Sequence, residues 1–467
     1  MRFCNYHESD TVLTESSPSS TFSPMEKRAT LSLASLYGFR MLGLFMVLPV
    51  LALYQDNYAD ATPFLLGLTL GVYGLTQALL QIPLGVLSDK IGRTPVIVGG
   101  LLMFVLGSVV AALADTMHGL IIGRALQGMG AIASTLMAMV ADLTSEENRT
   151  KAMASIGASI GLSFILAMIL GPLIAASMGL PAIFWVTALL GLIGILIFLI
   201  FVPRVVEVHR NRETLAEIKH IATLLREPTL LRLNAGIFAL HLVLMAAFVV
   251  IPSILAEELD ISADNLWWVY LALLGGGFVA MLPAMILGEK YHRQKLSFVS
   301  AIACMAIAIL LLGTARGVLM TPLMLLVFFA CFNLLEASLP SWVSKACPAG
   351  RRGTVMGIYS TSQFLGAFVG GTLGGFSLQQ FGIDGLFLML AGVLASWWLL
   401  SLGLQSQRPL QTLVLHVGDT GHSDFVKIIS AIVGVEDILL IKGESLAYVK
   451  VDKQTVDMQS IRPYLKR

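Results

Sequence analysis

The segment GVLSDKIGRTP, from Gly85 to Pro95, places three charged residues between two long apolar runs. Asp89, Lys90 and Arg93 fall within five positions, in a 467-residue chain that is 56% hydrophobic and only 13% charged. A soluble protein carries about 25% charged residues. Such an excess of apolar residues cannot be buried in one core. The sequence therefore predicts a membrane protein, in which this segment connects two membrane-spanning helices.

The apolar runs on either side of this loop continue through most of the chain. We count twelve stretches that approach or exceed about 20 residues, the length that a helix needs to cross a bilayer. They cover roughly 30–54, 64–88, 94–115, 118–141, 150–178, 181–203, 230–255, 265–288, 296–315, 319–344, 353–378 and 383–404. A charged linker at 204–229 follows the sixth stretch. The sequence thus predicts an all-α membrane fold of two six-helix halves, 29–203 and 230–405.

Lysine and arginine are unevenly distributed between the two sets of connections. The short connections 55–63, 115–118, 178–181, 256–264 and 378–383 contain neither residue, and Arg316 is the only basic residue on that side. The other side carries the remaining basic loops and the 204–229 linker. Because basic loops stay in the cytoplasm, we expect both termini to be cytoplasmic in a multi-pass protein.

The first residues have a different composition from the apolar stretches. Residues 1–28 are polar and rich in Ser and Thr, so we expect a disordered tail without a cleavable signal peptide. Met25, directly before the first span, is a candidate initiator. The net charge of +1 gives no support to a nucleic-acid partner, and the four scattered cysteines predict neither a disulfide framework nor a metal site.

Three motifs resemble those of the major facilitator superfamily, a family of transporters. The opening loop matches G-x-x-x-D-[RK]-x-G-R at Gly85, Asp89, Lys90, Gly92 and Arg93. The segment GRALQGMG resembles the fourth-span motif, with Arg124 at its basic position, and AMILGPLIAA resembles an antiporter motif, with Gly171 and Pro172 in place. The resemblance covers residues 30–404. It implies a secondary active transporter of the bacterial inner membrane that needs no cofactor and binds protons and a small molecule.

The resemblance further implies proton-coupled export of amphipathic compounds by alternating access. Two alternatives stay open at this point: a proton symporter, or a membrane sensor that signals through its C-terminal domain. No extended catalytic motif supports an enzyme. In the family, the loop acid bridges to the start of span 11 when the protein is open outward. We therefore expect Asp89 to form a latch to that helix, with Gly85 permitting the approach and Asp142 pairing with Arg93.

Four ionisable residues lie at membrane depth, where such groups are costly and usually functional. Glu336 is the only deep carboxylate, and His241 is the only deep histidine. A proton-coupled carrier needs groups that change charge, and these two side chain types can do so. Arg124 and Arg40 complete the set. A static salt bridge between Glu336 and Arg40, or a hydrogen-bonded core role for His241, are the alternatives.

Further polar residues are expected to line a central cavity. Tyr73, Gln77 and Gln81 recur every four residues on span 2 and so share one helix face. Asn333 lies on the same face as Glu336. Tyr359 and Gln363 follow on span 11.

After Pro409 the composition becomes that of a soluble domain, which we place at 410–467. The pattern strand, helix, strand, strand, helix predicts a small ferredoxin-like α+β domain. The domain resembles heavy-metal-associated domains, but its first loop lacks their cysteine pair, so we expect no metal at His416 or His422. The domain is expected to be regulatory. A monomer is favoured, with oligomerisation through this domain as the alternative.

Overall fold

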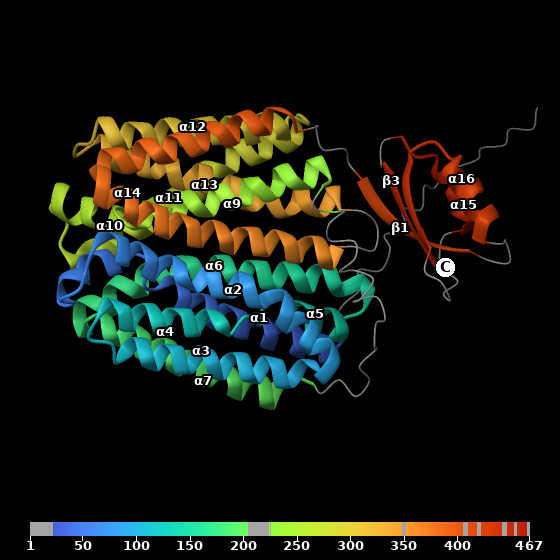
Figure 1. Ribbon diagram of the computed structural model, residues 1–467. Helices are drawn as coiled ribbons and strands as arrows, with labels where there is room; N and C mark the ends of the chain where they lie inside the picture. Colours follow the sequence, from blue (N-terminus) through green and yellow to red (C-terminus); the bar gives the residue numbers. More distant parts are fainter. Residues whose placement is uncertain are drawn as a thin grey trace, which may run out of the picture.

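The computed structural model describes residues 22–203, 224, 226–347, 352–404, 410–417, 422–440, 446–452 and 455–464. Long, nearly parallel helices form a bundle of two halves that lie side by side (Figure 1). The N-terminal half contains α1 (Pro24–Phe45), α2 (Pro63–Ile91), α3 (Arg93–Ala112), α4 (Met117–Met129), α5 (Ala133–Leu143), α6 (Glu146–Met178) and α7 (Leu180–Phe201). The C-terminal half contains α9 (Pro228–Phe248), α11 (Leu266–Lys290), α12 (Gln294–Thr314), α13 (Met320–Ala346) and α14 (Arg352–Leu402).

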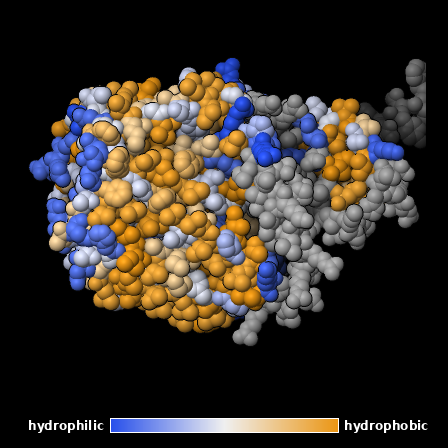
Figure 2. All heavy atoms as spheres, viewed as in Figure 1, coloured by the Kyte–Doolittle hydropathy of each residue, from blue (hydrophilic) through white to orange (hydrophobic). Residues whose placement is uncertain are grey.

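The bundle has the size and surface of a membrane protein. Within the described residues, ten helices are long and apolar enough to cross a bilayer. The helix α14 merges two of the expected spans, and its backbone breaks at Gly382, where φ is +68°. The surface shows a broad hydrophobic band between hydrophilic ends (Figure 2). This band is the surface that lipid chains would cover.

Three expected spans are interrupted rather than continuous. The helix α1 ends at Phe45 and leads into the 3₁₀-helix η1 (Leu51–Asn57). The expected span 118–141 is divided between α4 and α5, and α9 is followed by the short α10 (Ile251–Ser253), the π-helix η2 (Ile254–Glu258) and the 3₁₀-helix η3 (Ala263–Asn265). Pro49, Gly130 and Pro252 lie at or next to these interruptions, where they weaken a continuous helix.

The first helix begins earlier than the sequence predicts. Ser23 caps α1, and its hydroxyl accepts from the N–H of Glu26 while the Glu26 carboxylate accepts from the N–H of Ser23. This capping box places 24–28, which we expected in the polar tail, in the first turns of the helix.

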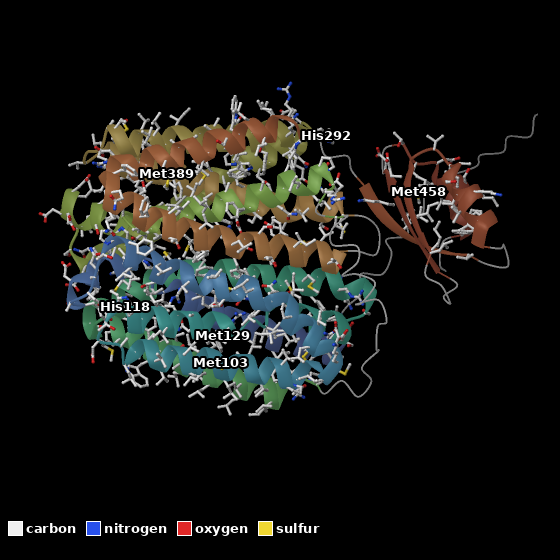
Figure 3. All side chains as sticks on the ribbon, in the orientation of Figure 1. Met103, His118, Met129, His292, Met389 and Met458 are labelled. Atoms are coloured by element: carbon white, nitrogen blue, oxygen red, sulfur yellow. The ribbon has the colours of Figure 1, made fainter. Side chains whose placement is uncertain are left out.

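The two ends of the bundle differ. We call the end nearest the C-terminal strands the tail end and the opposite end the far end; Figure 3 labels His292 at the tail end and His118 at the far end. The halves meet closely at the far end, where a Cβ on Gly67 of α2 would lie 2.1 Å from the carbonyl oxygen of Gly371 of α14. Beside this contact, the N–H of Phe64 donates to Gln379 Oε1 at 3.3 Å. The far end is therefore sealed by contact between backbones.

A small sheet forms the C-terminal domain. It consists of β1 (Leu410–His416), β2 (Val435–Leu440) and β3 (Leu446–Asp452) in the antiparallel order β1-β3-β2. The helix α15 (His422–Ser430) packs Phe425 and Ile429 against this sheet, and α16 (Met458–Ile461) with η4 (Arg462–Tyr464) completes the described part. Lys450 of β3 donates to the carbonyl oxygens of Lys345 and Cys347 at the end of α13.

Candidate functional site

An acid–histidine cluster lies in the C-terminal half, on three different helices. His241 comes from α9, Glu336 from α13 and Gln363 from α14. Gln363 Nε2 lies 2.8 Å from His241 Nε2. Since an amide nitrogen donates and cannot accept, His241 Nε2 is the acceptor, and a neutral ring then carries its proton on Nδ1. That Nδ1 lies 3.9 Å from Glu336 Oε2.

The cluster is neither fully buried nor fully solvated. The side chain of Glu336 is 36% exposed, whereas that of His241 is 13% exposed. One carboxyl oxygen of Glu336, Oε2, and the hydroxyl of Tyr359 are buried without a hydrogen-bond partner in the described part of the chain. Asn333, one turn earlier on α13, is half-buried. A carboxyl group in such surroundings can exchange a proton with water that reaches it from one side.

An arginine cluster lies in the N-terminal half. Arg40 is 2% exposed, and its Nη2 donates to the Tyr73 hydroxyl at 2.8 Å and to Gln77 Oε1. Gln77 in turn donates to Gln81 Oε1 at 3.3 Å. Arg40 Nε and Nη1 have no partner among the described residues. Tyr73, Gln77 and Gln81 thus share one face of α2, as the sequence predicts. They are buried in this cluster and do not line the cavity described below.

The alternative of an Arg40–Glu336 salt bridge is not realised in this structure. Among the described residues, the Glu336 carboxyl group faces His241, and Arg40 has the neutral partners Tyr73 and Gln77. The reason is geometric: Arg40 points from α1 towards α2 inside its own half, whereas Glu336 belongs to the other half.

Arg124 is the second buried cation of the N-terminal half. It is 0% exposed, donates from Nη1 to Gln127 Oε1 at 2.9 Å, and lies with its Nε 3.4 Å from the carbonyl oxygen of Thr69. Gln127 continues the chain to Ser108 Oγ at 2.8 Å. The guanidinium groups of Arg124 and Arg40 lie 5.3 and 5.9 Å from the centre of the Tyr73 ring. Tyr73 therefore links the two cations.

Aromatic rings connect the clusters across the boundary between the halves. Tyr73 lies 6.4 Å from Phe364, the neighbour of Gln363, measured between ring centres. Phe164 of α6 stacks on Phe332 of α13 at 6.5 Å, and Phe332 lies 6.1 Å from the ring of His241. The two clusters thus face the same boundary without a direct ion pair between the described groups.

Arg93 orders the charged loop between α2 and α3. Its guanidinium binds Asp89, Ser88 Oγ at 2.7 Å and, from Nε, Asp142 Oδ2 at 3.2 Å. Between α2 and α3, Gly92 has a φ of +98°, a conformation that favours glycine. Arg93 therefore ties together three helices of one half at the tail end. Lys90 is exposed.

One expectation for this loop is not tested by the described residues, and another differs from the structure. Asp89 pairs with Arg93; its expected bridge to the start of span 11 stays a prediction, because Arg351 and the side chain of Arg352 lie outside the described residues. A Cβ on Gly85 would meet Ser134 of α5 at 3.2 Å, so Gly85 permits packing within its own half. The halves approach most closely elsewhere, at the far end.

The span-5 motif serves helix packing. A Cβ on Gly171 of α6 would lie 2.3 Å from the carbonyl oxygen of Met46, where the chain leaves α1. Pro172 follows inside α6. The motif thus lies against the interruption of the first span.

A cavity of about 890 Å³ lies between α1 and α6 towards the tail end. Lys27 and Lys151 lie at the tail-end limit of its lining, and Leu42 and Leu166 lie at the opposite limit.

The expectation that the C-terminal domain binds no metal at His416 or His422 stays a prediction, because these two side chains are not among those that the structure describes.

Sequence reasoning missed the carboxylates that fasten the ends of the bundle. Glu26 accepts from the N–H of Ser145 at 2.8 Å and from Asn148 Nδ2 at 3.2 Å, so it caps the start of α6 as well as α1. At the far end, the Met117 N–H donates to Asp60 Oδ1 at 2.7 Å and holds the pKa of that carboxyl below its usual range. Of these two carboxylates, only Glu26 has a signal in the sequence, the S-x-x-E pattern of a capping box at Ser23–Glu26.

Comparisons with known proteins place the fold in a wider context. A family model described as the Major Facilitator Superfamily matches residues 33–371 and 233–441. The inner membrane transport protein YajR of Escherichia coli (strain K12) is 42% identical over 447 residues, which cover 95% of this chain and 98% of that protein. The quinolone resistance protein NorA of Staphylococcus aureus is 25% identical over 368 residues, or 75% of this chain and 90% of NorA.

Solved structures share the architecture at low sequence identity. The crystal structure of a D-xylose-proton symporter matches with a TM-score of 0.63 and 16% identity, over 81% of this chain and 98% of that one. At this identity the match shows the fold alone.

Proposed function

Because the chain belongs to the major facilitator superfamily, we propose that it exports small amphipathic compounds in exchange for protons by alternating access. The family and the relatives identify a transporter rather than an enzyme. Likeness to YajR supports a place in the bacterial inner membrane, and the more distant likeness to a quinolone resistance protein supports export.

The proposed membrane topology has twelve spans in two halves. In the described part of the chain, ten helices meet the length and hydropathy of a span; counting α14 as two around Gly382 and adding α1 gives twelve. The halves are 29–203 and 230–405, joined by the linker 204–229. The order β1-β3-β2 with α15 on the sheet supports a ferredoxin-like domain at 410–467. The excess of lysine and arginine at the tail end supports a cytoplasmic location for that end.

With this orientation, the structure represents a state closed to the outside. The backbone contacts between α2 and α14 seal the far end, while the cavity between α1 and α6 lies towards the tail end. We assign the latch residues to the opposite state. When the tail end closes, Asp89 would leave Arg93 and bind the start of α14, and Asp142 would retain Arg93.

The observation that carries proton coupling is the acid–histidine cluster. Glu336 presents a half-exposed carboxyl group at the boundary between the halves, and His241 faces it at 3.9 Å. A carboxylate that is charged when hydrated and protonated when enclosed can couple proton movement to the change of state. Arg124 and Arg40 lie in the N-terminal half, and each is 2% exposed or less. They keep their positive charge, so the electrostatic potential of that half stays positive while Glu336 of the C-terminal half changes charge.

Flux measurements in vesicles test this function. Proteoliposomes with an imposed pH gradient would be supplied with tritiated estrone sulfate and, separately, tritiated tetraphenylphosphonium, two amphipathic probes of opposite charge. We expect gradient-driven accumulation of at least one probe. In Glu336→Gln, accumulation should stop while exchange of labelled for unlabelled probe continues. The control is Glu289→Gln, an exposed acid at the end of α11. Gradient-driven accumulation by Glu336→Gln at the normal rate would contradict the proposed role.

A further inference from the structure

The cavity between α1 and α6 has the volume of a small-molecule site. Its 890 Å³ falls within the roughly 300–1,000 Å³ of ligand pockets. It extends along α1 from Lys27 to Leu42, a rise of about 22 Å at 1.5 Å per residue. A drug-sized molecule can lie along it.

The lining changes in character along this length. Lys27 and Lys151 lie nearest the tail end, the hydroxyls of Ser155 and Ser159 follow on one face of α6, and Leu42 and Leu166 end the cavity. Serines spaced by four residues recur on the same helix face. A molecule with a polar group at one end and an apolar body would match this order.

The charges of the lining have one sign. The described residues that line the cavity include two lysines and neither aspartate nor glutamate. Glu26, the acid next to Lys27, is not among the lining residues, and its carboxylate accepts hydrogen bonds from Ser23, Ser145 and Asn148. The cavity therefore favours an anionic group at its tail end.

A second observation, independent of the lining, also indicates a positive electrostatic potential around the cavity. Arg40 and Arg124 are buried in the N-terminal half, and their described partners are neutral oxygens. The described acids of this half lie at helix ends or in loops. Arg40 directly follows Phe39, which lines the cavity. Because charges act over longer distances in a medium of low dielectric constant, these cations add to the positive potential around it.

Resting on the proposed transport function, we propose that the substrate is an amphipathic organic anion, such as a sulfate or carboxylate ester of an apolar body. Its charged group binds between Lys27 and Lys151, and its apolar part extends towards Leu42 and Leu166.

Equilibrium binding to the full-length protein in a neutral detergent tests this without any gradient. Tritiated estrone sulfate should bind more tightly than tritiated tetraphenylphosphonium. The double change Lys27→Gln and Lys151→Gln should weaken binding of the sulfate by about tenfold, the sum of two modest charge interactions. Lys27→Arg with Lys151→Arg should retain it. The control is Lys290→Gln, an exposed tail-end lysine of the other half. A higher salt concentration should weaken the binding of estrone sulfate to the wild type more than its binding to the double glutamine variant.

Three results would overturn the proposal: tighter binding of the phosphonium, unchanged sulfate binding in the double variant, or an effect of equal size in Lys290→Gln. Native mass spectrometry in the presence of phosphatidylglycerol separates a small anion from a lipid headgroup. Loss of lipid adducts in the double variant with unchanged sulfate affinity would assign the cavity to lipid instead. Sulfate binding that survives without any proton-driven flux would contradict the proposed function and leave this inference intact.

Discussion

Glu26 is a single residue that fastens two helices at the tail end. Its carboxylate accepts from the N–H of Ser23 and the N–H of Ser145, so it caps α1 and α6 together. The Ser145 N–H, followed by that of Ser23, lowers the pKa of Glu26 to about 2 from an ordinary value of 4.5. The group lies before the first expected span, where water can reach the helix ends.

We expect Glu26→Gln to destabilise the protein by about 1 kcal/mol, a typical value for a lost helix cap. The pKa is depressed in the folded state, so the carboxylate stabilises the fold above about pH 4.5, and this contribution is lost as the pH falls towards 2. The melting temperature of the variant should therefore be lower at pH 7 and approach that of the wild type in acid. Glu289→Gln serves as the exposed control. An equal deficit of Glu26→Gln at pH 7 and pH 3 would assign the effect to packing instead of charge.

For the buried ionisable residues, the sequence predicts their depth in the membrane better than it predicts the side chains that they contact. It placed Arg40, Arg124, His241 and Glu336 within apolar stretches, and all four lie in long helices of the bundle. It could not decide whether Arg40 meets Glu336 or Tyr73, because that depends on how each helix is rotated and which half it packs in. A residue pattern along one helix fixes neither quantity.

At the scale of elements, α14 uses its glycines on two faces. Gly366, Gly370 and Gly374 form a stripe of small residues that packs closely against α9. Gly371 and Gly375 approach α2 instead. The sequence shows the glycines but not which neighbour each face meets, since both partners are far away along the chain.

The contact between α2 and α14 yields a prediction about the sealed state. A Cβ at Gly371 would lie 2.4 Å from the carbonyl oxygen of Gly67, so Gly371→Val must separate the helices at the far end. Overpacking of this kind costs about 1–3 kcal/mol, enough to change the ratio of two states by roughly tenfold. We expect a cysteine introduced at Gln379, in a background without native cysteines, to be labelled faster from the far side. Gly357→Val is the matched control on the same helix, because nothing lies within 4 Å of its Cβ position. Equal labelling of both variants would show that this contact does not hold the far end closed.

Helix interruptions were the main feature of the elements that the sequence did not show. Hydropathy records how apolar a stretch is and not whether it is continuous, so 118–141 was read as one helix although α4 and α5 divide it. The family assignment, by contrast, rested on residues in three separate loops and spans, and the comparisons confirm it.

Asp89 and Asp142 have different roles in the proposed latch between the two halves of the molecule. Both bind Arg93 in this structure, which has a sealed far end. Only Asp89 is proposed to move to α14 when the tail end closes. A carboxylate at a favourably placed helix N-terminus contributes up to about 2 kcal/mol, which corresponds to a roughly thirtyfold shift between two states.

We therefore expect Asp89→Asn to slow transport and to increase cysteine labelling in the cavity from the tail side. Substrate affinity in the far-end-sealed state should hardly change. Asp142→Asn removes the other partner of Arg93 and should leave this labelling close to that of the wild type. If the two variants behave alike, Asp89 acts only through Arg93 inside its own half, and the latch would have to be abandoned.

The contact of Lys450 with α13 has a consequence for biosynthesis. Lys450 donates to the carbonyl oxygens of Lys345 and Cys347, yet every helix of the bundle precedes it along the chain. The ribosome has therefore completed all of those helices before this contact can form. During synthesis, the last carbonyls of α13 therefore lack the hydrogen bonds from Lys450 until the C-terminal domain has been made. This contact therefore joins the C-terminal domain to helices that the ribosome has already made, and it cannot guide the synthesis of those helices.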